Sequence, residues 1–380
     1  TRNFKLTVNQ EDNENENNAT VDLDFDDRLK KLQTLFNQSD SRIGLAEKSL
    51  EQLANSSRYS DDQNEVRLEQ IENSLEENTN SSEKSNNRLN ELIRILYDKI
   101  FKTLSTSHGV YSSAVLLNGR LASGHNDGSI RIWNVDTGEV MKTFSVHSYA
   151  VHSLAVLPNG RLASGSYYYA SQYSINGPIK ILNAETGEVI KTMTDHSSEV
   201  FSLAVLPNGR LASGSADDTV KIWNYETGEL IRTLSGHSND IRSLAALPDG
   251  SLASGSADNT IKIWNVETGK AIRTLSGHSS HVYSLKILPD GKLASGSLDD
   301  TIKIWNVDTS EIIKTLSGDS SDVYSLFVLK DGKLASGSSD KTIRIWNVET
   351  GKVIKTLYGH TSTVYSLAVL PDGRLASGST

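Results

Sequence analysis

The chain has 380 residues, with 47 acidic and 38 basic side chains and a formal net charge of −9. It contains no cysteine, which excludes disulfide bonds, cysteine nucleophiles and thiolate metal sites. No apolar run approaches the ~18 residues of a membrane-spanning helix, and the acidic balance argues against a nucleic-acid partner. We therefore expect no membrane and no nucleic acid among its partners, and a cytoplasmic location. The first residue is Thr1 rather than methionine, so a native N-terminus could be missing.

Composition divides the chain close to residue 104. All five tryptophans lie after residue 130, and residues 1–104 carry 21 acidic and 14 basic side chains. The negative charge therefore belongs mostly to the first part. Residues 1–25 are rich in Asn, Asp and Glu, and such a segment has too little to bury, so we predict that it is disordered.

Residues 26–98 are predicted to form a helical, coiled-coil-like stalk. Their apolar residues recur at steps of three and four, which marks one helical face. A spacing of seven connects Leu29, Phe36, Ile43, Leu50, Ile71 and Leu92. The same series is interrupted by polar residues, which weaken a seam or set its register: Ser57, Asn64, Asn78 and Ser85. The segment is interpreted as an oligomerisation stalk; the alternative is a solvated helical or half-disordered linker.

A repeat of 41 residues governs the rest of the chain. The motif LASG occurs seven times, at intervals of 41 residues except for one of 49, starting at Leu121, Leu162, Leu211, Leu252, Leu293, Leu334 and Leu375. Tryptophan follows the same spacing at Trp133, Trp223, Trp264, Trp305 and Trp346. Leu182 stands where a sixth tryptophan would be, and the long interval comes from extra residues around Tyr167–Gly177.

Each repeat reads as four short strands. In the third repeat these are EVFSLAVL (199–206), RLASGS (210–215), VKIWNY (220–225) and ELIRTL (229–234). Alternating apolar residues and the turn residues between them predict hairpins. A unit of this size cannot bury both faces alone, so neighbouring units are expected to stack radially.

These residues resemble the WD-repeat β-propeller family, whose units run about 40–45 residues with a Gly-His…Trp-Asp signature. The matching pairs are Gly236–His237, Gly277–His278 and Gly359–His360, with Trp-Asn in place of Trp-Asp. The resemblance covers residues 99–380. It implies an all-β, seven-bladed propeller, preceded here by the helical segment.

The resemblance also implies a structural tetrad of His, Ser, Asp and Trp within a blade. By motif position the third, fourth and fifth repeats supply His196, Ser213, Asp217, Trp223; His237, Ser254, Asp258, Trp264; and His278, Ser295, Asp299, Trp305. Ser, His and Asp could be misread as a catalytic triad. Because an active site is built once, whereas this set is repeated, we interpret the tetrads as structural.

Three repeats depart from the tetrad. The sixth has Asp319 in the His position, facing Asp340, so we predict a weak blade whose melting temperature rises in Asp319→His. The second has Asn176 and Leu182 in the Asp and Trp positions. The first keeps its Asp and Trp and is assigned His108, two residues closer to the following strand.

Closure of the ring leaves two alternatives, because the chain stops at Thr380, halfway through the seventh repeat. Residues 99–104 match the fourth-strand pattern and residues 92–96 match the third more weakly, so the N-side could complete the blade as a clasp. Alternatively the chain is truncated and its next residues would read like TIKIWN; the missing methionine favours this.

No motif for a phosphate, a dinucleotide or a zinc-protease metal is present, so we expect no catalytic residue, cofactor or metal. Paired acids such as Asp217–Asp218 and Asp299–Asp300 are explained by turn formation.

The predicted partner-binding residues follow the first Val or Ile of each inner strand: Tyr111, His152, Phe201, Arg242, Tyr283, Tyr324 and Tyr365. The resemblance places this position at the top mouth of the channel. Two residues earlier stand Glu199, Asp240, His281 and Asp322, which make part of the rim acidic. Our hypothesis is that the top face takes a peptide, with aromatics gripping an apolar or basic side chain. The alternative is that the repeated Tyr is only strand packing.

A second candidate contact patch is the tyrosine-rich insertion Tyr167–Gly177, which could equally fold onto the neighbouring blade. The predicted function is a non-enzymatic scaffold for protein or peptide partners, with the helical arm forming a homo-oligomer. The alternative is a substrate-recognition subunit of a larger enzyme assembly such as a ubiquitin ligase. A propeller enzyme is disfavoured because no unique polar constellation interrupts the repeats.

Overall fold

The computed structural model describes residues 4–9, 101–171, 174–207, 209–318 and 321–380. The predicted helical stalk and Asp319 lie outside these residues. The chain divides into two units, residues 1–7 with 104–380 and residues 8–103, and the core described below belongs to the first. In the described part of the chain, no helix is long and apolar enough to cross a membrane.

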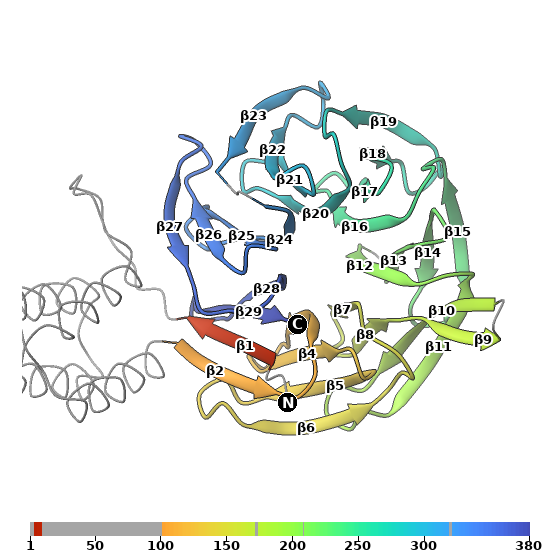
Figure 1. Ribbon diagram of the computed structural model, residues 1–380. Helices are drawn as coiled ribbons and strands as arrows, with labels where there is room; N and C mark the ends of the chain where they lie inside the picture. Colours follow the sequence, from red (N-terminus) through yellow and green to blue (C-terminus); the bar gives the residue numbers. More distant parts are fainter. Residues whose placement is uncertain (1–3, 10–100, 172–173, 208, 319–320) are drawn as a thin grey trace, which may run out of the picture. The chain divides into compact units, whose positions relative to one another are not determined.

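Seven sheets of four strands, here called blades, surround a common axis (Figure 1). The inner strands are β3 (Val110–Val115), β7 (Ser153–Val156), β12 (Val200–Leu206), β16 (Ile241–Ala246), β20 (Val282–Ile287), β24 (Val323–Val328) and β28 (Val364–Val369). The second strands carry LASG: β4 (Leu121–His125), β8 (Leu162–Gly165), β13 (Arg210–Ser215), β17 (Leu252–Ser256), β21 (Leu293–Ser297), β25 (Leu334–Ser338) and β29 (Leu375–Ser379).

The third strands are β5 (Ser129–Trp133), β10 (Ser174–Leu182), β14 (Thr219–Asn224), β18 (Thr260–Trp264), β22 (Thr301–Trp305), β26 (Ile343–Trp346) and β1 (Phe4–Asn9). The outer strands are β6 (Val140–Ser145), β11 (Val189–His196), β15 (Leu230–Ser235), β19 (Ala271–Ser276), β23 (Ile312–Ser317), β27 (Val353–Leu357) and β2 (Phe101–Thr106). In the second blade an extra strand, β9 (Tyr168–Ser171), comes from the insertion and pairs with β10. The four-strand prediction therefore describes each complete repeat.

The seventh blade combines both ends of the sequence, with the strand order β2-β1-β29-β28 (Figure 1). The clasp alternative predicted its fourth strand close to the observed β2, but placed residues 92–96 in the third position. That position is filled by residues 4–9, which also corrects the prediction that residues 1–25 are all disordered. The segment FKLTVN alternates apolar and polar residues, which is the period of a strand with one buried face.

The ring is continuous at the seam between the seventh and first blades. Strand β28 lies beside β3, and the Ser366 hydroxyl donates to the Ser113 hydroxyl at 2.7 Å. At the same seam, Arg374 of the seventh blade and Asp136 of the first blade form an ion pair at 2.7 Å. The same contact recurs at three other seams, between Arg120 and Glu185, Arg161 and Glu226, and Arg210 and Glu267. The closing seam is thus built like the internal ones.

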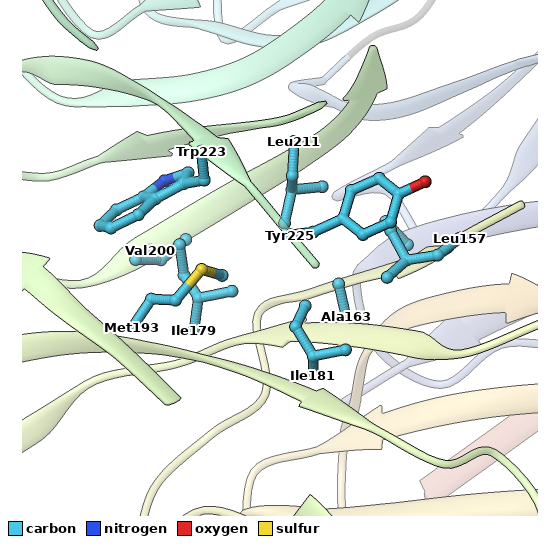
Figure 2. Packing of buried hydrophobic residues seen from close by; sticks show 10 residues of the cluster. Leu157, Ala163, Ile179, Ile181, Met193, Val200, Leu211, Trp223 and Tyr225 are labelled. Atoms are coloured by element: carbon cyan, nitrogen blue, oxygen red, sulfur yellow. The ribbon is translucent and has the colours of Figure 1, made fainter. Parts of the chain in front are cut away.

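Close approach between blades explains the glycine of LASG. A Cβ added to Gly255 would lie 2.7 Å from Val282 of the next blade, and one on Gly378 would lie 2.5 Å from Val110 across the closing seam. Apolar side chains fill the remaining space. Figure 2 shows one such layer, between the second and third blades, in which Ile179 and Met193 face Trp223.

Candidate functional site

Each tetrad of the third, fourth and fifth blades is assembled from the segment before the inner strand, the second strand, the third strand and the turn between these two strands. In the fifth blade, Trp305 Nε1 donates to Ser295 Oγ at 2.7 Å, Ser295 Oγ lies 2.7 Å from His278 Nε2, and His278 Nδ1 lies 2.7 Å from Asp299. The third blade repeats the arrangement at 2.7–2.8 Å and the fourth at 2.7 Å. These side chains hold the loop before an inner strand against the central hairpin.

Two of the three bonds in these tetrads have a fixed direction. Trp Nε1 can only donate, so the serine oxygen accepts from it. An ionised carboxylate can only accept, so His Nδ1 donates to it. Burial alone would raise the pKa of Asp217, but bonds from His196, Thr219 and Ser197 outweigh it and hold this pKa at about 2. The serine side chains of these three tetrads are fully buried in the core, so the sets offer no accessible nucleophile.

The first blade uses a different histidine from the one predicted. Ser123 Oγ accepts from Trp133 at 2.6 Å and lies 2.7 Å from Nε2 of His125, which is fully buried. His108 is half-exposed and pairs instead with Asp127 at 3.2 Å. The assignment of His108 to the buried tetrad position is therefore wrong. The signal was available, because His125 replaces a residue that is serine at the corresponding place of every other repeat.

The second and sixth blades lack complete tetrads. In the second, His147 Nε2 lies 2.8 Å from Ser164 Oγ, and Leu182 occupies the tryptophan position. His147 Nδ1 is buried without a hydrogen-bond partner in the described structure. In the sixth, Arg344 pairs with Asp340 at 2.7 Å, so a cation neutralises that carboxylate. The Asp319→His prediction stays a prediction.

The seven predicted partner-binding residues form one closed ring around the axis, called here the mouth ring. Ring centroids are 5.1 Å apart for Tyr111–His152, 5.3 Å for His152–Phe201, 4.8 Å for Tyr283–Tyr324, 4.9 Å for Tyr324–Tyr365 and 5.3 Å for Tyr365–Tyr111. Arg242 completes the ring, with its Cζ 3.9 Å from the Phe201 centroid and 5.2 Å from that of Tyr283. All seven side chains are half-buried.

A β-bulge explains why these side chains gather at the axis. In six blades the pairing of the inner and second strands shifts register at the mouth-ring residue, for example between Val282 and Ser284, on either side of Tyr283. A bulge leaves its extra residue unpaired and redirects the side chain. Val282 and Ser284 are buried, whereas the bulged Tyr283 is half-buried and reaches toward the axis.

The predicted acidic rim stands beside the mouth ring. Asp240 forms an ion pair with Arg242. Burial raises the pKa of Glu199, and burial with the charge of Asp300 raises that of Asp322. His281 stacks on Tyr283 with centroids 6.4 Å apart. The mouth ring itself carries the single positive charge of Arg242, because burial and then the charge of Arg242 lower the pKa of His152 to about 4 and keep it neutral.

An aromatic row extends the mouth ring over the second blade. Tyr167, the first residue of the insertion, lies 5.9 Å from His152 and stacks on Tyr149 at 4.8 Å. One tyrosine of the insertion thus lies beside the mouth ring, at the end of the axis where the inner strands begin. The role of the other insertion residues stays a prediction. Among the residues that the structure describes, no group of His, Asp or Glu could hold a metal ion.

Comparison with known families agrees with this geometry. The profile of the family described as WD domain, G-beta repeat matches seven segments, residues 99–134, 138–168, 187–224, 228–265, 269–306, 310–347 and 351–380. They cover more than half of the chain. No curated protein sequence matches the chain.

Proposed function

The chain belongs to the WD-repeat family, and we propose that its propeller is a non-enzymatic scaffold whose mouth ring binds a peptide segment of a protein partner. Propellers of this family generally bind other proteins. The observation that carries the proposal is the closed ring of five aromatics, His152 and Arg242, all half-buried at one end of the axis. We call that end, where the inner strands begin, the top face.

The composition of the mouth ring suits recognition. Aromatic and Arg side chains dominate binding hot spots because they present large rigid surfaces with few rotatable bonds. Tyr324 already contacts both Tyr283 and Tyr365, so these three side chains lose little conformational freedom when a ligand covers them. Burial raises the pKa of Tyr324 to about 12, so its hydroxyl stays protonated; it donates to Asp322 and keeps a lone pair that can accept from a backbone N–H. Apolar faces and polar edges are thus both available to an extended peptide.

The test begins with a displayed library of random peptides selected on the immobilised protein. Enriched peptides are then measured on the double variant Tyr283→Ala/Tyr324→Ala. Since hot-spot residues contribute about 2 kcal/mol or more each, the two changes together should lower the affinity by about 1,000-fold. Leu117→Ala is the control, because this side chain is 70% exposed and follows the far end of β3. Failure to enrich any peptide, or equal binding by the double variant with an unchanged circular dichroism spectrum, would refute the proposal.

We further propose that residues 26–98 oligomerise and so raise the valency of the mouth rings. The heptad series in the sequence supports this. They lie within the segment of residues 10–100, which joins β1 to β2, neighbours in the seventh blade. Its replacement by a short turn would therefore leave a continuous β-hairpin. Light scattering should give an oligomer for the full chain and a monomer for the shortened one, whereas a monomeric full chain would contradict the proposal.

A substrate-recognition subunit of a ubiquitin ligase or a similar assembly is the second candidate function. The same aromatic mouth ring and its acidic rim would then hold a substrate segment. Co-purification separates the two, since ligase components should accompany the protein only in the second case. A cytoplasmic location is part of both proposals, and it rests on the composition alone.

A further inference from the structure

Arg242 is the one permanently charged residue of the mouth ring. Six of the seven equivalent positions carry Tyr, Phe or His. Its guanidinium lies 3.9 Å from the Phe201 centroid and 5.2 Å from the Tyr283 centroid, and it pairs with Asp240. A cation between two aromatic faces and beside a carboxylate is the arrangement by which aromatic sites bind basic ligands. In this arc of the ring, the chain itself supplies that cation.

The positive charge of Arg242 is felt across half of the mouth. It lowers the pKa of His152 and opposes the effect of burial on Glu199, Tyr283 and, as the last of several contributions, Tyr324. A Lys or Arg of a ligand placed in this arc would meet a like charge at short range and would compete for the same carboxylate. The arc from Phe201 to Tyr283 is therefore closed to basic side chains.

The opposite arc has aromatic faces and negative charge but no cation of its own. Tyr324, Tyr365 and Tyr111 follow one another at 4.9 and 5.3 Å. Asp322 accepts hydrogen bonds from Tyr324 and Ser339 and lies near Asp300, and neither carboxylate has an ion-pair partner within the described parts of the chain. Their mutual repulsion contributes to the raised pKa of Asp322. A cation bound there would relieve it.

We propose that Arg242 is a built-in occupant of the mouth ring, which directs a Lys or Arg side chain of the bound peptide to the arc of Tyr324, Tyr365 and Tyr111. Asp322 and Asp300 supply the countercharge there. Arg242 thereby determines specificity without contacting the basic side chain that it positions. This inference rests on the proposed function, because it concerns the ligand of the same ring.

The experiment uses peptides enriched on the full-length protein, together with versions in which their basic residue is replaced by Gln. We expect the enriched peptides to contain Lys or Arg. The Lys-to-Gln change in the peptide should cost about tenfold against the wild type and little against Asp322→Asn, since a contacting pair is not additive. Asp331→Asn is the control, because it removes a carboxylate that follows the other end of β24.

Arg242→Gln provides the second arm. Loss of its like charge should strengthen binding of the basic peptides by about tenfold, and 1 M salt should reduce this gain because charges between exposed groups are screened. Weaker binding to Arg242→Gln, additive effects of Asp322→Asn and the peptide change, or enrichment of acidic peptides would each overturn the inference. If peptides bind but depend only on the tyrosines, the proposed function survives and this inference fails. If binding ignores the tyrosines, the proposed function itself fails.

Discussion

Replacing Ser295 by Ala removes the atom on which the fifth tetrad converges. The hydroxyl is fully buried and accepts from Trp305 Nε1 at 2.7 Å while lying 2.7 Å from His278 Nε2. In the variant the indole N–H and the imidazole nitrogen both lose their partner, and the surrounding core offers neither of them water.

The magnitude follows from these two orphaned groups. A buried polar group left without a partner costs about 1–3 kcal/mol, so the variant should lose roughly 2–6 kcal/mol. At about 2 °C per kcal/mol for a unit of this size, the melting temperature should fall by roughly 4–12 °C. Thermal melting followed by circular dichroism measures the change.

The second blade supplies a matched control. Ser164 is equally buried and lies 2.8 Å from His147 Nε2, but Leu182 stands in place of the tryptophan. Ser164→Ala therefore orphans one group rather than two, and its loss should be about half that of Ser295→Ala. Equal losses in the two variants would refute the reasoning that the tryptophan bond adds to the stability of a blade.

Three further predictions concern the ring as a whole. Burial lowers the pKa of His125 to about 4 and of His147 to about 3, so the unfolded chain takes up protons that the fold does not. Stability should fall as pH drops below about 6.5, and melting temperatures unchanged from pH 7.5 to 4.5 would contradict this. Ser251→Arg should add a second cation beside Asp308 of the next blade, which now pairs with Arg273 at 4.0 Å, and stabilise by about 0.2–1 kcal/mol in urea unfolding, a gain that 1 M salt should remove. Leu6→Pro should open the seventh blade, because proline removes a donor from a strand paired on both sides. If the variant resists limited proteolysis as well as the wild type does, β1 is not the third strand of that blade.

Most of the fold could be predicted from the sequence repeat, because each strand, turn and buried Trp recurs at a fixed place. The mouth ring could be located for the same reason, since Tyr283 and its equivalents hold one position in every repeat. Its contacts could not be read from the sequence. That Arg242 lies over Phe201 depends on side-chain conformations that only the closed ring of bulged strands fixes.

The sequence analysis missed two features, strand β1 and the tetrad role of His125, for different reasons. Strand β1 lacks the Trp-Asn signature of a third strand and precedes β2 by 91 intervening residues, so only long-range pairing with β29 identifies it. His125 was overlooked because the expected histidine of that repeat, His108, was present nearby in the sequence. The local pattern fitted either residue, and burial decides between them.

The most direct test of the central claim is hydrogen–deuterium exchange of the full-length protein with and without an enriched peptide. The account predicts slower exchange where the inner strands begin, at residues 109–112, 322–325 and 363–366, and no change in outer strands such as β15 and β19. Protection confined to the outer strands, or to the turns that follow the far ends of the inner strands, would contradict the claim that the mouth ring is the binding site.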